Sequence, residues 1–551
     1  MAVLRLYLEP QRRWLEDLSQ GRPLSAHSHG LRDLLALFYV RVEGDCRGLR
    51  FSVEVGEGEP AGDFRLVEEA GHLGLAALDS EQQSELEAAA LEGAEVYCGT
   101  WERLFTLTGD RGWEPGRQGE VLRRRQFKAA AYRLLSEQTG KCFPWGSLTG
   151  IRPQYIAGEF LASGASPEEA QQALVQQYQL RPDKAALALE VAAETERQRR
   201  RLGPEDLLLY VGVAFCPSRC SYCSFSSPEG IARPEEEKEA YVQALCQQLD
   251  FLLERYGDRV RCVYIGGGTP TELSYGQLDQ LFSQLARRLD MDRLSEFCLE
   301  AGRSDSLTYE KLALARRYAV GRVCLNPQSM QAETMLRVGR IQTPEEIRRC
   351  YRWMRELGFS SINMDLIAGL PGESPEDYLD SVAQLLALRP ENIMLHSLAQ
   401  KRSAQLESAV SWQEGSRGPG RAQVEADGEA LRRALGSTAE PWALAQERAL
   451  ALLRAAGYRP YYMYRNKAAL GGLENIGLCL EKQVCLYNVA MMEDLAPVLA
   501  CGAGAMNKWV AGKRVERLPG LRNIRLYVER CADFCRRQER FFQEQEARGE
   551  C

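Results

Sequence analysis

The sequence predicts an α/β fold built around a parallel sheet, and the pattern of residues 207–398 carries this prediction. Six short apolar segments rich in β-branched residues alternate there with stretches of helical periodicity. The strands are expected at 207–213, 261–266, 296–300, 322–326, 361–368 and 392–398. Open doubly wound sheets and closed or partial barrels both satisfy this alternation, and in both the chemistry lies at the carboxyl ends of the strands.

The stretch after residue 342 illustrates the helices that separate these strands. Thr343 can cap a helix, and Pro344 suits the first helical position. Ile347 and Met354 then fall on one face, and Gly358 ends the pattern. The segment is therefore expected to pack an amphipathic helix against the sheet.

The rest of the chain differs in character from this core, as 551 residues would allow for two to four domains. We expect an N-terminal α+β domain at 1–115, with strands at 3–8, 35–42 and 49–55, and a helical segment at 116–203. The core is expected at 204–404, a polar, glycine-rich linker at 405–440 and a mainly helical C-terminal domain at 441–551.

Composition excludes several classes of protein. The chain is 45% hydrophobic and 26% charged, which is typical of globular proteins. Its 69 Lys and Arg against 76 Asp and Glu give a net charge of −7, so no global basic field favours nucleic acid. No apolar run approaches the roughly 18 residues of a membrane span. We expect a cytoplasmic protein without a nucleic-acid partner.

Cys216, Cys220 and Cys223 form the sharpest motif, a C-x3-C-x2-C spacing on the loop after the first core strand. A structural zinc ion is one alternative, but it needs four ligands, and the next cysteine, Cys246, lies well along a predicted helix. An unligated loop is another alternative, although unpaired thiols usually hide in cores. Three thiolates on one loop suit three irons of a 4Fe-4S cube and leave the fourth iron open.

These cysteines and the motifs that follow them resemble radical S-adenosylmethionine enzymes. Within this group of enzymes, the motifs resemble the oxygen-independent coproporphyrinogen III dehydrogenase branch, and its long HemZ type in particular. It covers residues 207–402 and extends more loosely to 145–153 and 461–506. The matching residues are Tyr210–Cys216, Tyr264–Pro270, Leu299–Arg303, Asn326–Met330, Arg340 and Asn363–Gly372.

The resemblance implies a partial, open β/α barrel that uses a 4Fe-4S cluster and S-adenosylmethionine. Cys216, Cys220 and Cys223 would bind the cluster. The residues implied to bind S-adenosylmethionine are Gly266, Gly267, Gly268, Thr269, Glu300, Gln328, Arg340 and Asp365, with Tyr210 as a catalytic residue beside them. Glycines also suit a close approach of backbone to a ligand.

Each of these positions has a structural alternative. Glu300 could cap a helix, Arg340 could form a surface ion pair, and Asp365 could be a structural acid at a strand end. Tyr210 could equally be a core residue. The sequence departs from the family archetype at Gly212, where a histidine is usual, and at Phe225, where a fourth cysteine is usual.

By the same resemblance, the reaction is the radical decarboxylation of two propionates, which converts coproporphyrinogen III to protoporphyrinogen IX in haem biosynthesis. A reduced flavodoxin or ferredoxin-type protein would supply the electron. Arginine and lysine suit a substrate with four carboxylates, and the candidates are Arg152, Lys401, Arg402 and Arg465. His396, at a strand end, is expected to be a hydrogen-bonded core histidine rather than a substrate contact.

Two alternative functions share these motifs. A haem-binding or trafficking relative would keep the cluster and bind haem without oxidising a porphyrinogen. A radical methyltransferase acting on a tetrapyrrole would also release S-adenosylhomocysteine, whereas oxidative decarboxylation yields only methionine and 5′-deoxyadenosine from the cofactor.

Overall fold

The computed structural model divides the chain into two compact units, 1–192 with 431–436 and 193–430 with 437–551. Side chains are described for 142–150, 152–223, 230–399, 441–466, 472–512, 514–548 and several positions between 125 and 140. The backbone alone is described for strands β1–β5 and for a few helix-end residues. Each unit is considered by itself, and the five predicted domain ranges remain predictions.

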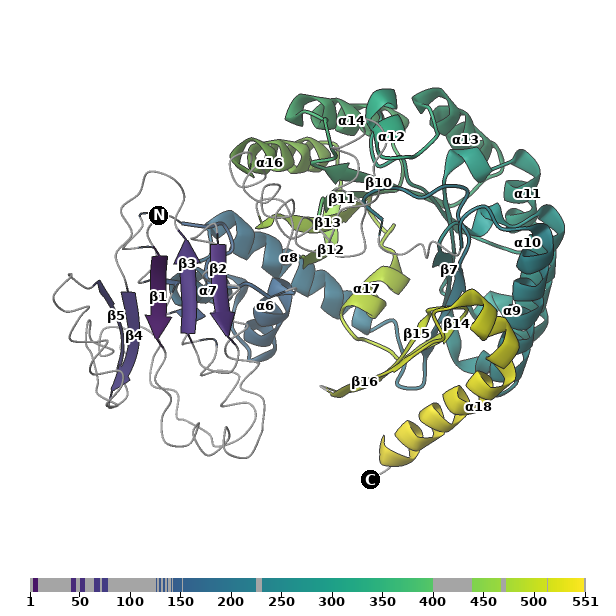
Figure 1. Ribbon diagram of the computed structural model, residues 1–551, viewed down its shortest axis with the longest axis horizontal. Coiled ribbons are helices and arrows are strands. Elements are labelled where there is room, and N and C mark those ends of the chain that lie inside the picture. Colours follow the sequence, from purple (N-terminus) through teal and green to yellow (C-terminus); the bar gives the residue numbers. More distant parts are fainter. Residues whose placement is uncertain are drawn as a thin grey trace. The chain divides into compact units, whose positions relative to one another are not determined.

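The centre of the second unit is a six-stranded parallel array in the order β6 to β11 (Figure 1). All six predicted strands are found, most within two residues of the expected ends. They are β6 Leu207–Val213, β7 Val260–Gly267, β8 Glu296–Gly302, β9 Arg322–Leu325, β10 Ser361–Ala368 and β11 Asn392–Ser397. They form because their apolar side chains are buried on both faces of the sheet, as parallel strands require.

Antiparallel strands extend this array on both sides into an 11-stranded sheet that does not close. On one side β11 pairs with β13 (Glu474–Cys479), which pairs with β12 (Arg459–Arg465). On the other side β14 (Val498–Cys501) runs parallel to β6, and β15 (Met506–Ala511) and β16 (Arg514–Pro519) follow as antiparallel neighbours. The predicted α/β class with a partial, open barrel is therefore confirmed.

Helices cover the outer side of the curved sheet in an arc (Figure 1). They are α9 Glu235–Tyr256, α10 Tyr275–Arg288, α11 Tyr309–Arg317, α12 Ala332–Arg337, α13 Pro344–Glu356 and α14 Pro375–Leu388. Helix α13 has the predicted start: the hydroxyl of Thr343 accepts a hydrogen bond from the backbone N–H of Glu346, whose side chain in turn accepts from the N–H of Thr343. Short 3-10 turns lie at η2 Gly257–Arg259, η3 Pro270–Glu272, η4 Met291–Arg293 and η5 Ser304–Ser306.

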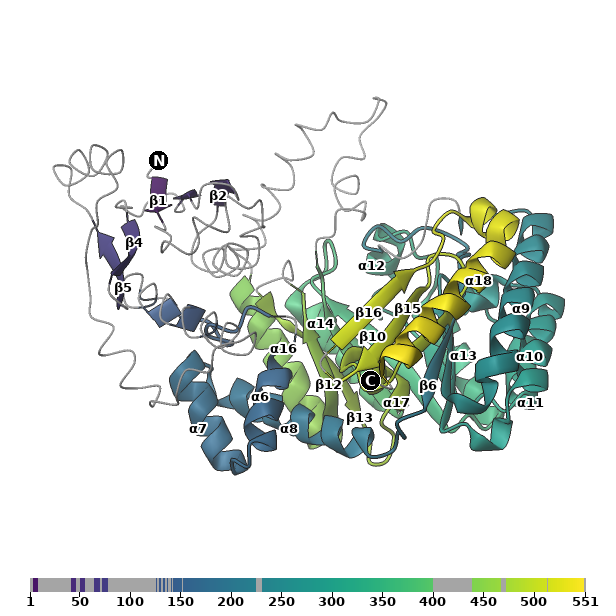
Figure 2. The same cartoon turned by 90° about the horizontal axis from the view of Figure 1, so that it is seen from below.

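The C-terminal region contains the expected helices α16 (Ala439–Ala455), α17 (Leu486–Met492) and α18 (Ile524–Gly549). The sequence analysis missed the five strands β12–β16 there, because they are short and partly aromatic or charged. Helix α17 lies on the inner side of the sheet, where Tyr487 stacks on Tyr264 of β7 with ring centroids 4.7 Å apart. Helix α18 packs along α9 (Figure 2), and Tyr241 contacts Tyr527 between them.

The first unit carries small antiparallel sheets and a helical segment. Its strands are β1 Val3–Tyr7, β2 Arg41–Asp45, β3 Arg50–Glu54, β4 Phe64–Glu69 and β5 His72–Ala77, and its helices are α6 Pro153–Ala162, α7 Pro167–Tyr178 and α8 Pro182–Arg199. The strand expected at 35–42 begins instead at residue 41, and β4 and β5 were not predicted. The cap expected at Ser166 is present at the start of α7.

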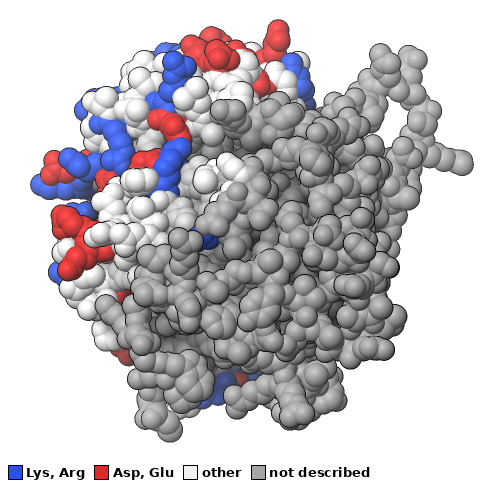
Figure 3. All heavy atoms as spheres, turned by 90° about the vertical axis from the view of Figure 1, so that its left-hand side faces the viewer, with Lys and Arg blue, Asp and Glu red and all other residues white. Residues whose placement is uncertain are grey.

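Charges of both signs are mixed on the described surface. On the face in Figure 3, the coloured Lys and Arg side chains are interspersed with Asp and Glu. The basic end of α8 shows the same mixture, since Arg197 pairs with Glu194 at 2.7 Å and Arg199 with Glu196 at 3.2 Å. None of the described helices combines the length and apolar character that a membrane crossing requires.

Candidate functional site

The predicted site residues meet at one edge of the sheet, where the parallel strands β6 to β10 end. Val213 at the end of β6 pairs with Gly267 at the end of β7. Farther along, Gln328 after β9 bridges to Leu366 in β10. Because the strands are parallel, their carboxyl ends bring together loops that are more than a hundred residues apart in sequence.

The cysteine loop follows β6, and its thiols are partly enclosed. Cys216 and Cys220 are buried, and Cys223 is half-buried. The hydroxyl of Thr269 lies 3.6 Å from the sulfur of Cys216, and Nη1 of Arg303 lies 3.7 Å from the sulfur of Cys220. Burial is the main cause that raises the pKa of Cys216 to about 11; the thiols of Cys223 and Cys220 act in the same direction, and Thr269 and Arg303 oppose them. The three thiols thus lie within electrostatic reach of one another.

Several contacts anchor this loop independently of any ligand. The hydroxyl of Ser218 donates to the carbonyl of Gly339 at 2.9 Å, and the N–H of Ser221 donates to the carbonyl of Val338 at 3.0 Å. Nη1 of Arg340 donates to the hydroxyl of Tyr222 at 3.2 Å. The cysteine spacing is therefore held by the segment after α12 as well as by the strand end.

The glycine run after β7 provides a close approach to the backbone of the cysteine loop. A Cβ atom on Gly268 would lie 2.4 Å from the carbonyl oxygen of Phe215 and 3.0 Å from the sulfur of Cys216. Gly267 has a φ of +111°, which side-chain-bearing residues rarely adopt. A Cβ on Gly266 would lie 2.5 Å from the carboxylate of Glu300. Only glycine fits this run, because its backbone packs directly against the cysteine loop and Glu300.

Glu300 lies against this glycine run, and its pKa is raised. Burial is the main cause that raises its pKa to about 7, and the nearby Asp365 raises it further. Hydrogen bonds from Tyr264 and from the backbone of Gly267 oppose these effects without cancelling them. Tyr210 stacks on Tyr264 with centroids 6.4 Å apart, and burial followed by the charge of Glu300 raises its pKa. Tyr210 thus lies beside the glycines, as predicted.

Two buried polar atoms without hydrogen-bond partners lie just after the end of β9. Oε1 of Gln328 and Oδ1 of Asn326 are buried and make no hydrogen bond within the described structure. Gln328 also has a φ of +72°, while its backbone is fixed by bonds to Asp365 and Ile367 of 2.8 Å each. A buried acceptor without a donor costs about 1–3 kcal/mol. These atoms therefore fit a ligand rich in hydrogen-bond donors, such as S-adenosylmethionine.

Arg340 corrects one of the sequence alternatives, because it is buried rather than part of a surface ion pair. Nη2 donates to the carbonyl of Asn326 at 2.6 Å and also to the carbonyl of Gly302. With Tyr222 as a third partner, the guanidinium joins the cysteine loop to the ends of β8 and β9. Its Nε has no partner within the described structure, so a contact with S-adenosylmethionine remains a prediction.

The arrangement of possible metal ligands bears on whether the cysteines bind zinc. Among the described side chains, no three His, Cys, Asp or Glu groups converge as the ligands of a single metal ion. Zinc requires such convergence. In a 4Fe-4S cube each protein ligand binds a different iron. Cys216, Cys220 and Cys223 lie on one loop and interact electrostatically, and their binding to the cube remains a prediction.

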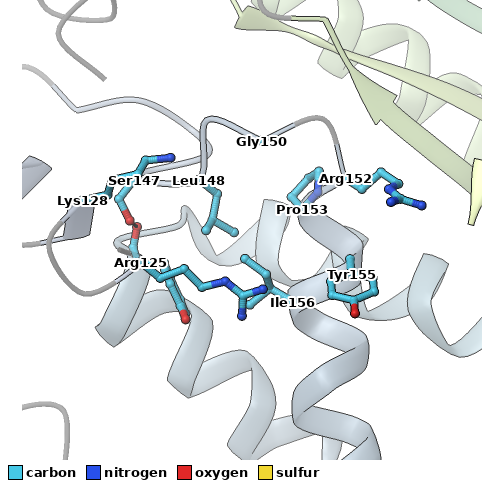
Figure 4. Close-up of a pocket in the computed structure, with 10 residues that line it drawn as sticks. Arg125, Lys128, Ser147, Leu148, Gly150, Arg152, Pro153, Tyr155 and Ile156 are labelled. Carbon is cyan, nitrogen blue, oxygen red and sulfur yellow. Dashed lines mark hydrogen bonds between the residues drawn. The ribbon is translucent and has the colours of Figure 1, made fainter. Parts of the chain in front are cut away.

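Of the four predicted substrate residues, Arg465 is the one that the structure describes in the second unit, at the carboxyl end of β12. Arg152 precedes α6 in the first unit and lines a pocket of about 280 Å³ with Arg125 and Lys128 (Figure 4). Arg465 is buried in β12, where it donates to the carbonyl of Gly472 at 3.0 Å, and burial lowers its pKa to about 10. Lys401 and Arg402 lie outside the described residues, as does Phe225.

His396 lies between the tyrosines of β12 and Asp365. Nδ1 of His396 lies 3.3 Å from both Oδ1 of Asn475 and the hydroxyl of Tyr464, and Nε2 lies 3.6 Å from the carboxylate of Asp365. Tyr462 is buried in a cluster on the inner side of the sheet, with its ring 4.9 Å from that of Tyr461 and 6.5 Å from that of Tyr464. The hydrogen bonds expected for His396 are present, and a contact with the substrate is not tested.

Arg303 lies beside the cysteine loop and is paired with Asp305, and the sequence analysis assigned no role to either residue. Arg303 ends the Leu299-to-Arg303 match, but its contact with Cys220 joins residues 83 positions apart. Such a contact becomes visible only when the strand order is known. The signal in the sequence was the position of an arginine directly after a strand end that carries the site.

Comparisons with known proteins agree with this geometry. The family model described as the Radical SAM superfamily matches residues 210–385. HemZ of Bacillus subtilis, an oxygen-independent coproporphyrinogen-III oxidase-like protein, is 33% identical over 386 residues, which cover 68% of this chain and 72% of the relative. The haem chaperone HemW of Bacillus subtilis is 32% identical over 191 residues, covering 34% of this chain and 49% of the relative.

Among solved structures, coproporphyrinogen III oxidase (HemN) from Escherichia coli aligns with 61% of this chain and 72% of its own, at 21% identity and a TM-score of 0.45. The match to HemZ covers more than two thirds of this chain. The chain therefore belongs to the radical SAM superfamily, in its HemZ-type branch, and its cofactors are a 4Fe-4S cluster and S-adenosylmethionine.

Proposed function

We propose that this chain catalyses the oxidative decarboxylation of coproporphyrinogen III to protoporphyrinogen IX. The observation that carries the proposal is the extent of the HemZ match, which reaches 68% of this chain, whereas the HemW match covers 34%. The similarity to HemZ thus continues well beyond the radical SAM core. The proposal includes a cytoplasmic location, anaerobic conditions and a reduced flavodoxin or ferredoxin-type electron donor.

Cys216, Cys220 and Cys223 hold the cluster in this proposal. When bound, the cluster and S-adenosylmethionine would supply the radical chemistry that removes a hydrogen atom from a propionate side chain. Thr269 and Arg303 donate hydrogen bonds towards two of the thiolates. The polypeptide's part is to hold these groups and to exclude water from the reacting carbon.

The residues around the glycine run bind and orient S-adenosylmethionine. Gly266, Gly267 and Gly268 leave room for its amino-acid end, and Glu300 and Asp365 offer negative charge to its cationic groups. Gln328 offers the acceptor atom that has no partner in the protein. Arg340 and Thr269 complete the proposed set, with Tyr210 at the face where the radical forms.

Carboxylate recognition is assigned to basic residues from several segments. Arg152 is the candidate in the first unit, and Lys401 and Arg402 follow β11. Arg465 is the weakest member of the group, because its guanidinium already donates to Gly472. Each cation would bind one propionate of the tetrapyrrole.

The test is anaerobic incubation of the reconstituted protein with dithionite, S-adenosylmethionine and coproporphyrinogen III. We expect protoporphyrinogen IX, its one-vinyl intermediate and 5′-deoxyadenosine by mass spectrometry. Cys220→Ala should lose cluster absorbance and both products, whereas Cys246→Ala, which removes a buried thiol of α9, should keep them. Retention of cluster or cofactor cleavage in Cys220→Ala would refute the assignment of the cysteines.

A haem-binding role is the second candidate, because the core is also 32% identical to the chaperone HemW. Haem uptake with unchanged coproporphyrinogen would favour it. S-adenosylhomocysteine among the products would instead favour methyl transfer. Cleavage of S-adenosylmethionine without a change in coproporphyrinogen would contradict the dehydrogenase proposal and retain the radical chemistry.

A further inference from the structure

Arg303 is a charged side chain that lies beside Cys220, the middle cysteine of the loop. It follows β8, and it is only 3% exposed. Its Nη1 donates to the carbonyl of Ser218 at 3.2 Å and lies 3.7 Å from the sulfur of Cys220. One arm of the guanidinium therefore faces both the backbone and a proposed ligand of the cluster.

The other side of the guanidinium is fixed by a carboxylate. Nε of Arg303 donates to one oxygen of Asp305 at 2.9 Å, and Nη2 donates to the other at 2.5 Å. This two-point contact sets the plane of the guanidinium and the direction of its remaining arm. The carboxylate of Asp305 also partly offsets the positive charge, and its side chain is 21% exposed.

We propose that Arg303 and Asp305 together set the reduction potential of the cluster held by Cys216, Cys220 and Cys223. This inference rests on the proposed cluster ligands. Reduction adds a negative charge to the cluster and its thiolates, and hydrogen bonds to cluster sulfurs and nearby charges are known determinants of such potentials. A buried cation beside Cys220 favours the reduced state, and Asp305 limits that effect.

The loop has enough other anchors for this electrostatic role to be separated from a structural one. Ser218 and Ser221 are bonded to the segment after α12, and Tyr222 is bonded to Arg340. The N–H of Cys216 donates to the carbonyl of Gly230 at 3.0 Å. None of these contacts involves Arg303, so we expect the loop to keep them when Arg303 is replaced, and Arg303 acts on the cluster through the thiolate of Cys220.

The test is a redox titration of the reconstituted 4Fe-4S cluster, followed by electron paramagnetic resonance, with iron counted per chain. We expect a lower midpoint potential in Arg303→Met and a higher one in Asp305→Asn, which keeps an acceptor for Arg303. The double variant should fall between them. Arg303→Lys, which retains the charge, should restore most of the potential lost in Arg303→Met.

A matched pair of charges away from the loop provides the control. Arg288 of α10 pairs with Asp250 of α9 at 2.8 Å, and Arg288→Met and Asp250→Asn should leave the potential unchanged. If Arg303→Met binds no iron, the midpoint potential of Asp305→Asn is the deciding measurement. A higher midpoint potential supports the proposal, and an unchanged or lower one overturns it. If the unmodified protein binds no cluster, the proposed function fails as well.

Discussion

The strand ends of β6, β7 and β8 differ from those of β9 and β10 in how their polar groups are satisfied. In the first group, Thr269 and Arg303 already donate towards the cysteine sulfurs, and Arg303 is held by Asp305. In the second group, Gln328 and Asn326 keep buried acceptor atoms without a donor in the described structure. The first region directs donors towards the cysteine sulfurs, and the second keeps buried acceptors without donors.

The difference indicates what each region holds. A cluster bound by thiolates needs ligands at fixed spacing, so a loop anchored before the metal arrives is an advantage. A cofactor that enters and leaves in each cycle must gain hydrogen bonds on binding, and orphaned acceptors provide them. Changes in the first region should therefore affect the cluster, and changes in the second should affect cofactor affinity with the cluster retained.

The largest expected effect comes from adding a methyl group at Gly268. In Gly268→Ala the new Cβ would meet the carbonyl of Phe215 at 2.4 Å, so the cysteine loop has to move. Overpacking of this kind costs about 1–3 kcal/mol, and here the strain falls directly on the cluster ligands. We expect most of the iron to be lost, as measured by iron analysis and absorbance.

Gly276→Ala is the matched control, because a Cβ at that position of α10 has no atom within 4 Å. It should bind iron normally. A Gly268→Ala protein with a full complement of iron would show that the close contact with Phe215 is not needed to hold the loop.

The next prediction concerns Glu300, which lies between the two regions. Its pKa is about 7 in the protein and 4.5 in the reference state. A carboxyl with a raised pKa contributes stability below about pH 4.5, and that contribution is lost as the pH rises through 7. The shift corresponds to a free energy of unfolding on the order of 3 kcal/mol. Glu300→Gln should remove this slope in denaturant unfolding between pH 4.5 and 8.

Cofactor affinity should show the opposite pH dependence. The carboxylate form of Glu300 attracts a cation, so the affinity for S-adenosylmethionine should rise with pH up to about 7, by at most about tenfold per unit. Burial also raises the pKa of Glu373 to about 7, and Glu373→Gln is therefore the control for stability alone. An affinity that rises equally with pH in Glu300→Gln would exclude Glu300 as the charged contact.

The sequence predicted the parallel core well because its strands are apolar on both faces. It predicted 207–213 and 361–368 with the bounds that the structure has. It failed for the flanking strands: β12 contains Tyr461 and Tyr464 but ends in arginine, and β16 is mostly exposed. A short edge strand with mixed residues has no strong periodicity, even where its partner is the neighbouring strand along the chain.

The site could be predicted where a residue's role depends on local spacing. Cys216, Cys220 and Cys223 and the glycines are of this kind, and they lie at the expected strand ends. The role of Arg303 depends on a partner 83 residues away. Arg340 illustrates the same limit, because its bonds to Asn326 and Tyr222 show that it joins three segments, whereas its sequence position suggested only a ligand contact or a surface pair.

The smallest expected effect, and the sharpest contrast with Gly268, comes from Gln328. Gln328→Leu removes a buried acceptor without a partner, so the cofactor-free protein should gain about 1 kcal/mol of stability. The same change should weaken binding of S-adenosylmethionine roughly fivefold, which is the equivalent of about 1 kcal/mol, with iron content unchanged. Gln331→Leu, three residues on and bonded to Asp380 at 2.8 Å, should leave cofactor affinity unaltered. Calorimetric titration of the iron-loaded proteins would measure the affinity of each variant for S-adenosylmethionine. Equal affinities in Gln328→Leu and the unmodified protein would show that the cofactor does not contact Gln328.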